Sequence, residues 1–177
     1  MNINNVIQGS RIMRVRELTA EVERLRIENA RLRNDLESLD RHLELAMLAN
    51  RDLEMLKRSG DNDAKLILID GWNLILGADR VATSPDELIN QAKLKLQTCK
   101  DSLVWIIFDG KDRNIRIEGN LRIFWTGGCG KQRADRFICD YLRMCKFSGD
   151  LSRIEISTFD KALLKAIKKI REKAEEI

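Results

Sequence analysis

One heptad pattern dominates the first third of the chain and restricts what it can fold into. Apolar residues recur at alternating spacings of three and four from Val15 to Leu53, with no proline or glycine among them. With Val15 as position a, the a positions hold Val15, Val22, Asn29, Leu36, Leu43 and Asn50, and the d positions hold Leu18, Leu25, Leu32, Leu39, Ala46 and Leu53. A repeat of this length is typical of a coiled coil.

Polar residues in and beside the repeat predict two parallel helices. Asn29 takes an a position between leucine layers, where a buried amide fixes the register and favours a parallel dimer. In that orientation Glu21 faces Arg26 of the second copy, and Glu28 faces Arg33. We therefore expect a homodimer through this coiled coil. The alternative is one long amphipathic helix packed on its own domain.

The pattern changes after a polar, glycine-bearing segment. Beyond it, four short apolar runs predict buried strands: Leu66–Ile69, Val104–Phe108, Leu121–Trp125 and Ile154–Ser157. Three helices are expected between and after them: from a capping box at Ser84 to about Lys100, from about Lys131 to Lys146, and from Asp160 to the end. Strands that alternate with helices predict an α/β fold, a small parallel sheet flanked by helices.

The predicted domain organisation follows from these two patterns. We expect a disordered or frayed N-terminus at residues 1–14, the coiled coil at 15–58, a hinge at 59–64, and the α/β domain at 65–177.

Composition narrows the classes of function. The net charge of +4 permits a nucleic-acid partner without requiring one. No apolar run could span a membrane, and the four cysteines lack zinc-site spacing, so we expect no membrane partner and reduced thiols in the cytoplasm. The single histidine, His42, lies far from the predicted sheet. Catalysis there would depend on carboxylates, lysines or a metal.

Four aspartates fall near the ends of the predicted strands. Asp70 ends the first strand, Asp109 ends the second, Asp160 closely follows the fourth, and Asp135 lies in the helix after the third. In an open parallel sheet, ligands bind at the carboxyl ends of the strands, so these acids would converge. Crowded carboxylates favour a divalent cation, and all-oxygen ligands favour Mg²⁺ or Mn²⁺. Taken singly, each acid is equally well explained as a turn residue, a helix cap or a solvated side chain.

These motifs resemble those of NYN domains, the PIN-like metal-dependent ribonucleases. The resemblance covers about residues 65–170 and rests on D-G-x-N after the first strand, a hydrophobic-Asp end of the second, A-D-x-x-I in the acidic helix and S-x-x-D near the fourth. It implies a PIN/NYN-like fold and hydrolysis of RNA phosphodiester bonds, with endonucleolytic cleavage favoured. It also implies that four acids hold the metal and that Asn73 orients a water or the phosphate; the catalytic set is Asp70, Asn73, Asp109, Asp135 and Asp160.

Three departures from the family pattern support a different class of function. Many relatives carry further acids where this chain has Arg136 and Cys139, and Phe159 is an extra residue in the last motif. The alternative is a catalytically inactive NYN module that acts as a dimeric RNA- or protein-binding adaptor.

A basic stretch adjoins the predicted site. Between Lys111 and Lys146 the chain has nine basic and four acidic residues, an excess that suits a polyanion. We predict RNA contacts from five of them: Lys111, Arg113, Lys131, Arg133 and Arg136. A solvated basic face is the simpler alternative. Trp72 and Trp125 are candidates for stacking on bases, although a tryptophan beside a strand end more often belongs to the core.

Overall fold

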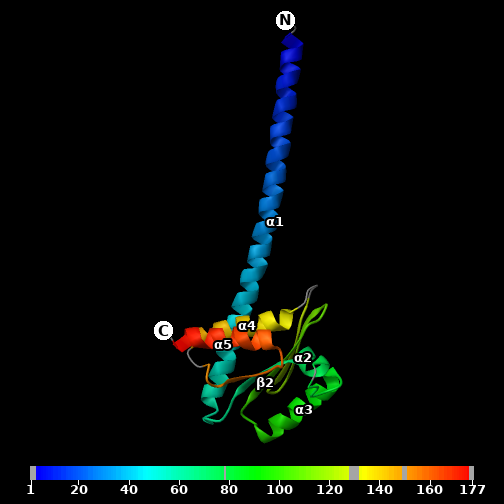
Figure 1. Cartoon of the computed structure of the whole chain (residues 1–177). Coiled ribbons are helices and arrows are strands. Elements are labelled where there is room, and N and C mark those ends of the chain that lie inside the picture. Colours follow the sequence, from blue (N-terminus) through cyan, green and yellow to red (C-terminus); the bar gives the residue numbers. More distant parts are fainter. Residues whose placement is uncertain (1–2, 78, 128–131, 149–150, 176–177) are drawn as a thin grey trace. The chain divides into compact units, whose positions relative to one another are not determined.

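A computed structural model of the chain shows a long helix followed by an α/β domain (Figure 1). The structure describes residues 3–77, 79–127, 132–148 and 151–175, without the side chains of residues 3–12, 37–38, 41–42, 147–148 and 173–175. The chain divides into two compact units, Met1–Leu43 and Glu44–Ile177. In the part of the chain that is described, no helix is long and apolar enough to cross a membrane.

The first helix, α1, spans Ile3–Arg58 and contributes to both units. It starts well before residue 15, so residues 3–14 are helical where a disordered or frayed N-terminus was expected. In the first unit the apolar heptad side chains are exposed: Val15, Leu18, Val22, Leu25, Leu32, Leu36, Leu39 and Leu43. In the second unit, by contrast, α1 contributes four buried side chains to the core: Leu45, Ala49, Leu53 and Leu56.

The predicted boundary between coiled coil and domain was therefore wrong. The α/β unit begins at Glu44, not at residue 65, because the last turns of α1 pack into its core. The segment expected as a hinge, residues 59–64, is hydrogen-bonded to another part of the domain. Arg153 donates hydrogen bonds to the carbonyl oxygen of Leu56 (3.1 Å) and to Oδ1 of Asn62 (3.3 Å), which join this segment to the start of β5.

The sheet has five strands in the order β3-β4-β2-β1-β5. Their bounds are Leu66–Asp70 (β1), Leu103–Phe108 (β2), Arg113–Glu118 (β3), Leu121–Thr126 (β4) and Ile154–Ser157 (β5). All neighbouring strands are parallel except β3 and β4, which are antiparallel. The predicted α/β fold is confirmed, and the sheet is mostly parallel where a parallel sheet was expected.

Two elements were not predicted from the sequence: β3 and the short helix α2, Gly71–Leu76. The signal for β3 was present. Ile115 and Ile117 alternate with polar residues, and Gly119 follows with a φ of 61°, as in a tight hairpin turn.

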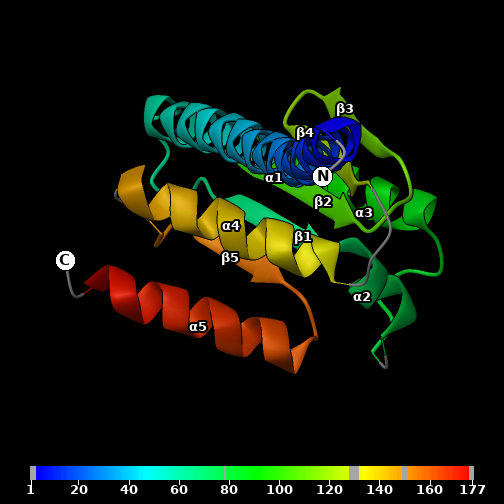
Figure 2. The same cartoon turned by 90° about the horizontal axis from the view of Figure 1, so that it is seen from above.

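Helices cover both faces of the sheet (Figure 2). On one face lie α2 and α3 (Pro85–Thr98), and on the other lie α4 (Arg133–Ser148), α5 (Lys161–Glu175) and the last turns of α1. Successive strand residues point to opposite faces. Leu66 and Leu68 of β1 therefore join the core with α4 and α5, whereas Ile67 and Ile69 join the core with α2 and α3. This explains an apolar run with no polar alternation.

The strand order places β1 at a reversal in the sheet. The chain proceeds from β1 to β2 and then β4 in one direction, and returns to place β5 on the opposite side of β1. In open α/β sheets, ligands bind at the carboxyl ends of the strands at such a point. Asp70, the last residue of β1, and the segment after β5 lie where a ligand is expected.

A candidate carboxylate site at the edge of the sheet

Asp70 ends β1 and caps α2. It is 5% exposed; its Oδ1 accepts a hydrogen bond from the backbone N–H of Asn73 (3.4 Å), and its Oδ2 accepts one from the hydroxyl of Thr158 (3.1 Å). The glycine that follows has a packing role. A Cβ on Gly71 would lie 2.3 Å from the ring of Phe108, so a glycine lets α2 begin directly against β2.

Asn73 joins the end of β1 to the segment after β5. Its Oδ1 accepts hydrogen bonds from the backbone N–H of Phe159 (2.6 Å) and from the hydroxyl of Thr158 (3.2 Å). That hydroxyl has a single proton, which Asn73 shares with Asp70. Oδ1 is already engaged as an acceptor. The side-chain NH₂ of Asn73 is therefore the group that remains to bind a ligand, as a hydrogen-bond donor.

Two more of the predicted acids cap helices. Asp109, directly after β2, accepts a hydrogen bond on Oδ1 from the backbone N–H of Ala134 at the start of α4 (2.6 Å). Asp160 accepts hydrogen bonds on Oδ1 from the N–H groups of Ala162 (2.6 Å) and Leu163 (3.0 Å) at the start of α5. These caps satisfy helical N–H groups and place negative charge at the positive end of each helix.

Asp135 completes the predicted set from the first turn of α4, and its side chain is half-buried. Burial raises its pKa, and the charges of Asp160 and Asp109 raise it further. Burial also raises the pKa of Asp70 to about 6, with the charge of Asp135 as the next cause. Asp135 thus lies close enough to Asp70, Asp109 and Asp160 for their charges to repel.

Their spacing limits what they hold without rearrangement. Among the described residues, no three acidic, histidine or cysteine side chains lie close enough together to enclose a metal ion. The chemistry of the donors nevertheless fits Mg²⁺ or Mn²⁺, because all are oxygens and a divalent cation would relieve their repulsion. The caps made by Asp109 and Asp160 use Oδ1, which leaves Oδ2 of each for a ligand.

The predicted RNA-contacting residues differ in solvent exposure and in whether they already have a hydrogen-bond partner. Lys111, in the loop after β2, and Arg136, in the first turn of α4, are exposed near the carboxyl edge. Arg133 donates a hydrogen bond to the carbonyl oxygen of Gly127 and is only half-buried. Lys131 lies outside the described residues.

Arg113, the fifth predicted RNA contact, and Arg122 both pair with acidic residues of α1. Arg113 forms an ion pair with Glu44, and its guanidinium carbon lies 5.7 Å from the centre of the Phe124 ring. Arg122 is 3% exposed and pairs with Asp52, so it cannot reach a polyanion. The excess of basic residues counted from the sequence therefore overstates the charge available to RNA.

Neither tryptophan near the site is an exposed platform. Trp72 packs edge-on against Phe108, with ring centres 5.3 Å apart, and its indole N–H donates to the carbonyl oxygen of Asp109 (2.7 Å). Trp125 stacks on the same phenylalanine at 5.8 Å. Both side chains are half-buried, which favours a role in the core.

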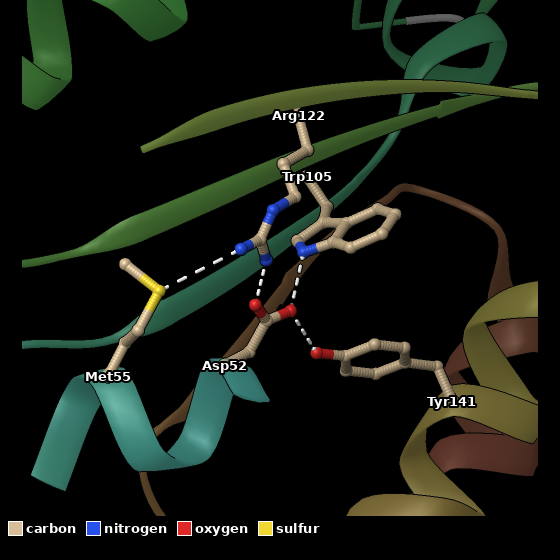
Figure 3. A network of polar contacts seen from close by, with 5 residues as sticks. All are labelled: Asp52, Met55, Trp105, Arg122 and Tyr141. Atoms are coloured by element: carbon tan, nitrogen blue, oxygen red, sulfur yellow. Dashed lines mark hydrogen bonds and ion pairs between the residues drawn. The ribbon is translucent and has the colours of Figure 1, made fainter. Parts of the chain in front are cut away.

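A buried polar network, which the sequence analysis missed, anchors α1 to the sheet (Figure 3). Asp52 has no exposed surface; besides its ion pair with Arg122, its Oδ2 accepts hydrogen bonds from the indole N–H of Trp105 (2.9 Å) and the hydroxyl of Tyr141 (2.6 Å). The Arg122 guanidinium lies 5.2 Å from the centre of the Trp105 ring. Four elements, α1, β2, β4 and α4, thus meet at one carboxylate.

The heptad register had placed Asp52 at an outward c position. Two signals pointed the other way. An arginine within the apolar run of β4 requires an acidic partner if it is buried, and Leu45, Ala49 and Leu56 form a second apolar stripe beside the heptad seam.

No family model, no curated protein and no solved structure matches the chain. Its function must therefore be inferred from its own residues.

Proposed function

We propose that the protein is a metal-dependent ribonuclease with a PIN-like domain of the NYN type, cutting RNA internally. One observation supports the proposal: a buried carboxylate, Asp70, lies at the reversal of the sheet beside half-buried acids whose charges repel it. Asp70 is the most buried of these acids, with no basic partner among the described residues and a pKa raised to about 6 by burial and by Asp135. Such an arrangement costs stability. Acids with strongly perturbed pKa values cluster at functional sites, where they have a chemical role.

The chain's residues divide the work of this reaction. Mg²⁺ or Mn²⁺, when bound by Asp70, Asp109, Asp135 and Asp160, supplies an activated water and stabilises charge on the phosphoryl group. The NH₂ group of Asn73 orients the scissile phosphate, while its Oδ1 and Thr158 hold the site together across β1 and β5. Lys111 and Arg136 bind the RNA backbone beside the acids.

The proposal includes a cytoplasmic homodimer. Residues 15–43 present an exposed apolar seam with Asn29 inside it, and the complementary Glu21–Arg26 and Glu28–Arg33 pairs require a parallel, in-register partner. Two sites on one dimer would hold the second near the RNA at high effective concentration.

An inactive NYN-type module, working as a dimeric RNA- or protein-binding adaptor, is the second candidate. Its support is that no three ligands converge among the described residues, and that Asp70, Asp109 and Asp160 already serve as helix caps. Cys139, where many NYN relatives carry an acid, is buried.

Cleavage of a labelled RNA pool in Mn²⁺ separates the two candidates. We expect the wild type to cut, the reaction to stop with a chelator, and Asp70→Asn and Asp135→Asn each to lose activity while keeping the fold by circular dichroism. Asp101→Asn, an exposed acid of the same domain, is the matched control and should cut like the wild type. Activity that survives both site substitutions rejects the mechanism, and a wild type that binds RNA but cuts neither RNA nor DNA favours the adaptor.

A further inference from the structure

Phe159 is unusual among the aromatic side chains of this chain. It is 43% exposed, whereas every other aromatic side chain among the described residues is buried or half-buried. The core therefore does not account for this ring. A single exposed apolar side chain is ordinary by itself, so its position matters more than its exposure.

The position of Phe159 is fixed by the proposed site. Its backbone N–H donates to Oδ1 of Asn73 (2.6 Å), the preceding Thr158 bonds Asp70 (3.1 Å), and the following Asp160 caps α5. A Cβ built on Gly77 would lie 3.8 Å from the ring, which places the ring beside the end of α2. A held backbone lowers the ordering cost when a ligand contacts the ring.

The ordinary explanation for such a residue is a hydrophobic staple. Asp160 is the cap of α5, so Phe159 and Leu164 take the two positions that pack together in that motif. Leu164 is 44% exposed, so a contact between the two would leave much of each side chain open to solvent. A staple requires only an apolar side chain, whereas stacking requires a ring, and this difference can be tested.

We propose that Phe159 forms a stacking subsite for one unpaired base next to the scissile phosphate, so that the substrate is single-stranded RNA. The proposal rests on the ribonuclease function above. Stacking of a base on an aromatic side chain contributes about 1–3 kcal/mol, whatever the base. A base inside a duplex is covered on both faces by its neighbours and is not available to the ring. The subsite therefore selects strand state and not sequence.

Three variants of the full chain separate stacking from stapling. Phe159→Leu keeps the apolar staple and removes the ring, Phe159→Trp keeps a ring, and Leu164→Ala weakens the staple alone. The measurement is binding of a labelled single-stranded oligoribonucleotide and of the same sequence as a duplex, in chelator so that no cleavage occurs.

We expect Phe159→Leu to weaken single-strand binding about 5- to 150-fold, with duplex binding unchanged. Phe159→Trp and Leu164→Ala should bind like the wild type, and tryptophan emission of Phe159→Trp should be quenched further by the single strand than by the duplex. Unchanged binding by Phe159→Leu, or an equal loss in Leu164→Ala, overturns the subsite. Binding is measured without cleavage, so the two proposals can fail separately. A protein that stacks RNA but never cuts it would reject the nuclease function and support the subsite. If the Phe159→Leu variant cuts RNA as well as the wild type does, the nuclease function is supported and the subsite is rejected.

Discussion

The two parts of α1 carry similar apolar residues in different surroundings. Leu43 is 62% exposed, and Leu45, two residues later, is 9% exposed. Before Glu44 the repeating apolar side chains of the seam lie at a and d; after it, the buried ones take c, d and g, and Asp52 is buried with them. Helical periodicity alone therefore does not identify the surface that a helix will bury.

The two parts of α1 differ in what can bury their apolar side chains. Burying a leucine contributes about 1.5–3 kcal/mol, and in residues 44–58 the chain's own sheet provides that burial. In residues 15–43 the same contribution is realised only when a second helix arrives. The first segment is thus suited to assembly and the second to folding.

Truncation at the two possible boundaries gives the largest expected effect. A chain lacking residues 1–43 should fold as a monomer, whereas one lacking residues 1–60 should be unfolded. The shorter chain loses three buried leucines, and it leaves Arg122 without its acid, which costs about 3–5 kcal/mol. Together these losses approach the whole stability of a small domain, about 5–15 kcal/mol. Circular dichroism and thermal melts would measure it, and a cooperative melt of the shorter chain would show that the anchor is dispensable.

Breaking the seam should abolish assembly and spare the domain. Leu25→Asp removes one leucine from each helix of the dimer, at about 3–6 kcal/mol together, and sedimentation should then show a monomer with an unchanged domain melt. Ile27→Asp is the matched control, because Ile27 is 66% exposed at an outward f position. Asn29→Leu should stabilise the helices and relax the choice of oligomer. A wild type that sediments as a monomer contradicts the seam.

Substituting one acid in each part of α1 sharpens the same contrast. Asp52→Ala should destabilise the domain by about 3–5 kcal/mol, since it strands a buried guanidinium. Asp35→Ala, on the exposed segment, should cost less than about 1 kcal/mol. Chemical denaturation measures both changes in the free energy of unfolding. Asp52→Ala is studied in the chain lacking residues 1–43, and Asp35→Ala in the full chain. Recovery of stability in Asp52→Leu with Arg122→Met would identify the stranded charge as the cause.

Asp70 is a buried acid whose replacement should raise the stability of the domain, whereas replacement of Asp52 should lower it. Its folded pKa is raised from 3.8 to about 6, so the folded metal-free protein binds a proton more tightly than the unfolded chain. Stability should therefore fall as the pH rises from about 4 through 6. Asp70→Asn should remove this decline and be more stable at pH 7 by about 2–3 kcal/mol at most. Denaturant titrations at several pH values in chelator measure it, and a pH profile shared by both proteins would rule out Asp70 as the source.

The sequence by itself determined most of the local elements, though not α2 or β3, and the order of the acids. Apolar runs specified β1, β2, β4 and β5, and the capping box at Ser84 specified the start of α3. The placement of Asp70, Asp109, Asp135 and Asp160 followed from strand ends, because parallel strands bring their carboxyl ends to one edge. The role of Gly71 could not be read in this way, since the ring of Phe108 that excludes a side chain comes from another strand.

Only the tertiary structure decided where along α1 the side chains begin to pack into the core of the α/β unit. Asp52 meets Trp105, Arg122 and Tyr141 across 53, 70 and 89 residues of chain, and no local period records such a meeting. The same holds for Thr158, which reaches Asp70 across 88 residues. Local patterns arise from geometry repeated along the backbone, whereas the partner of a buried polar group depends on which distant segments pack against it.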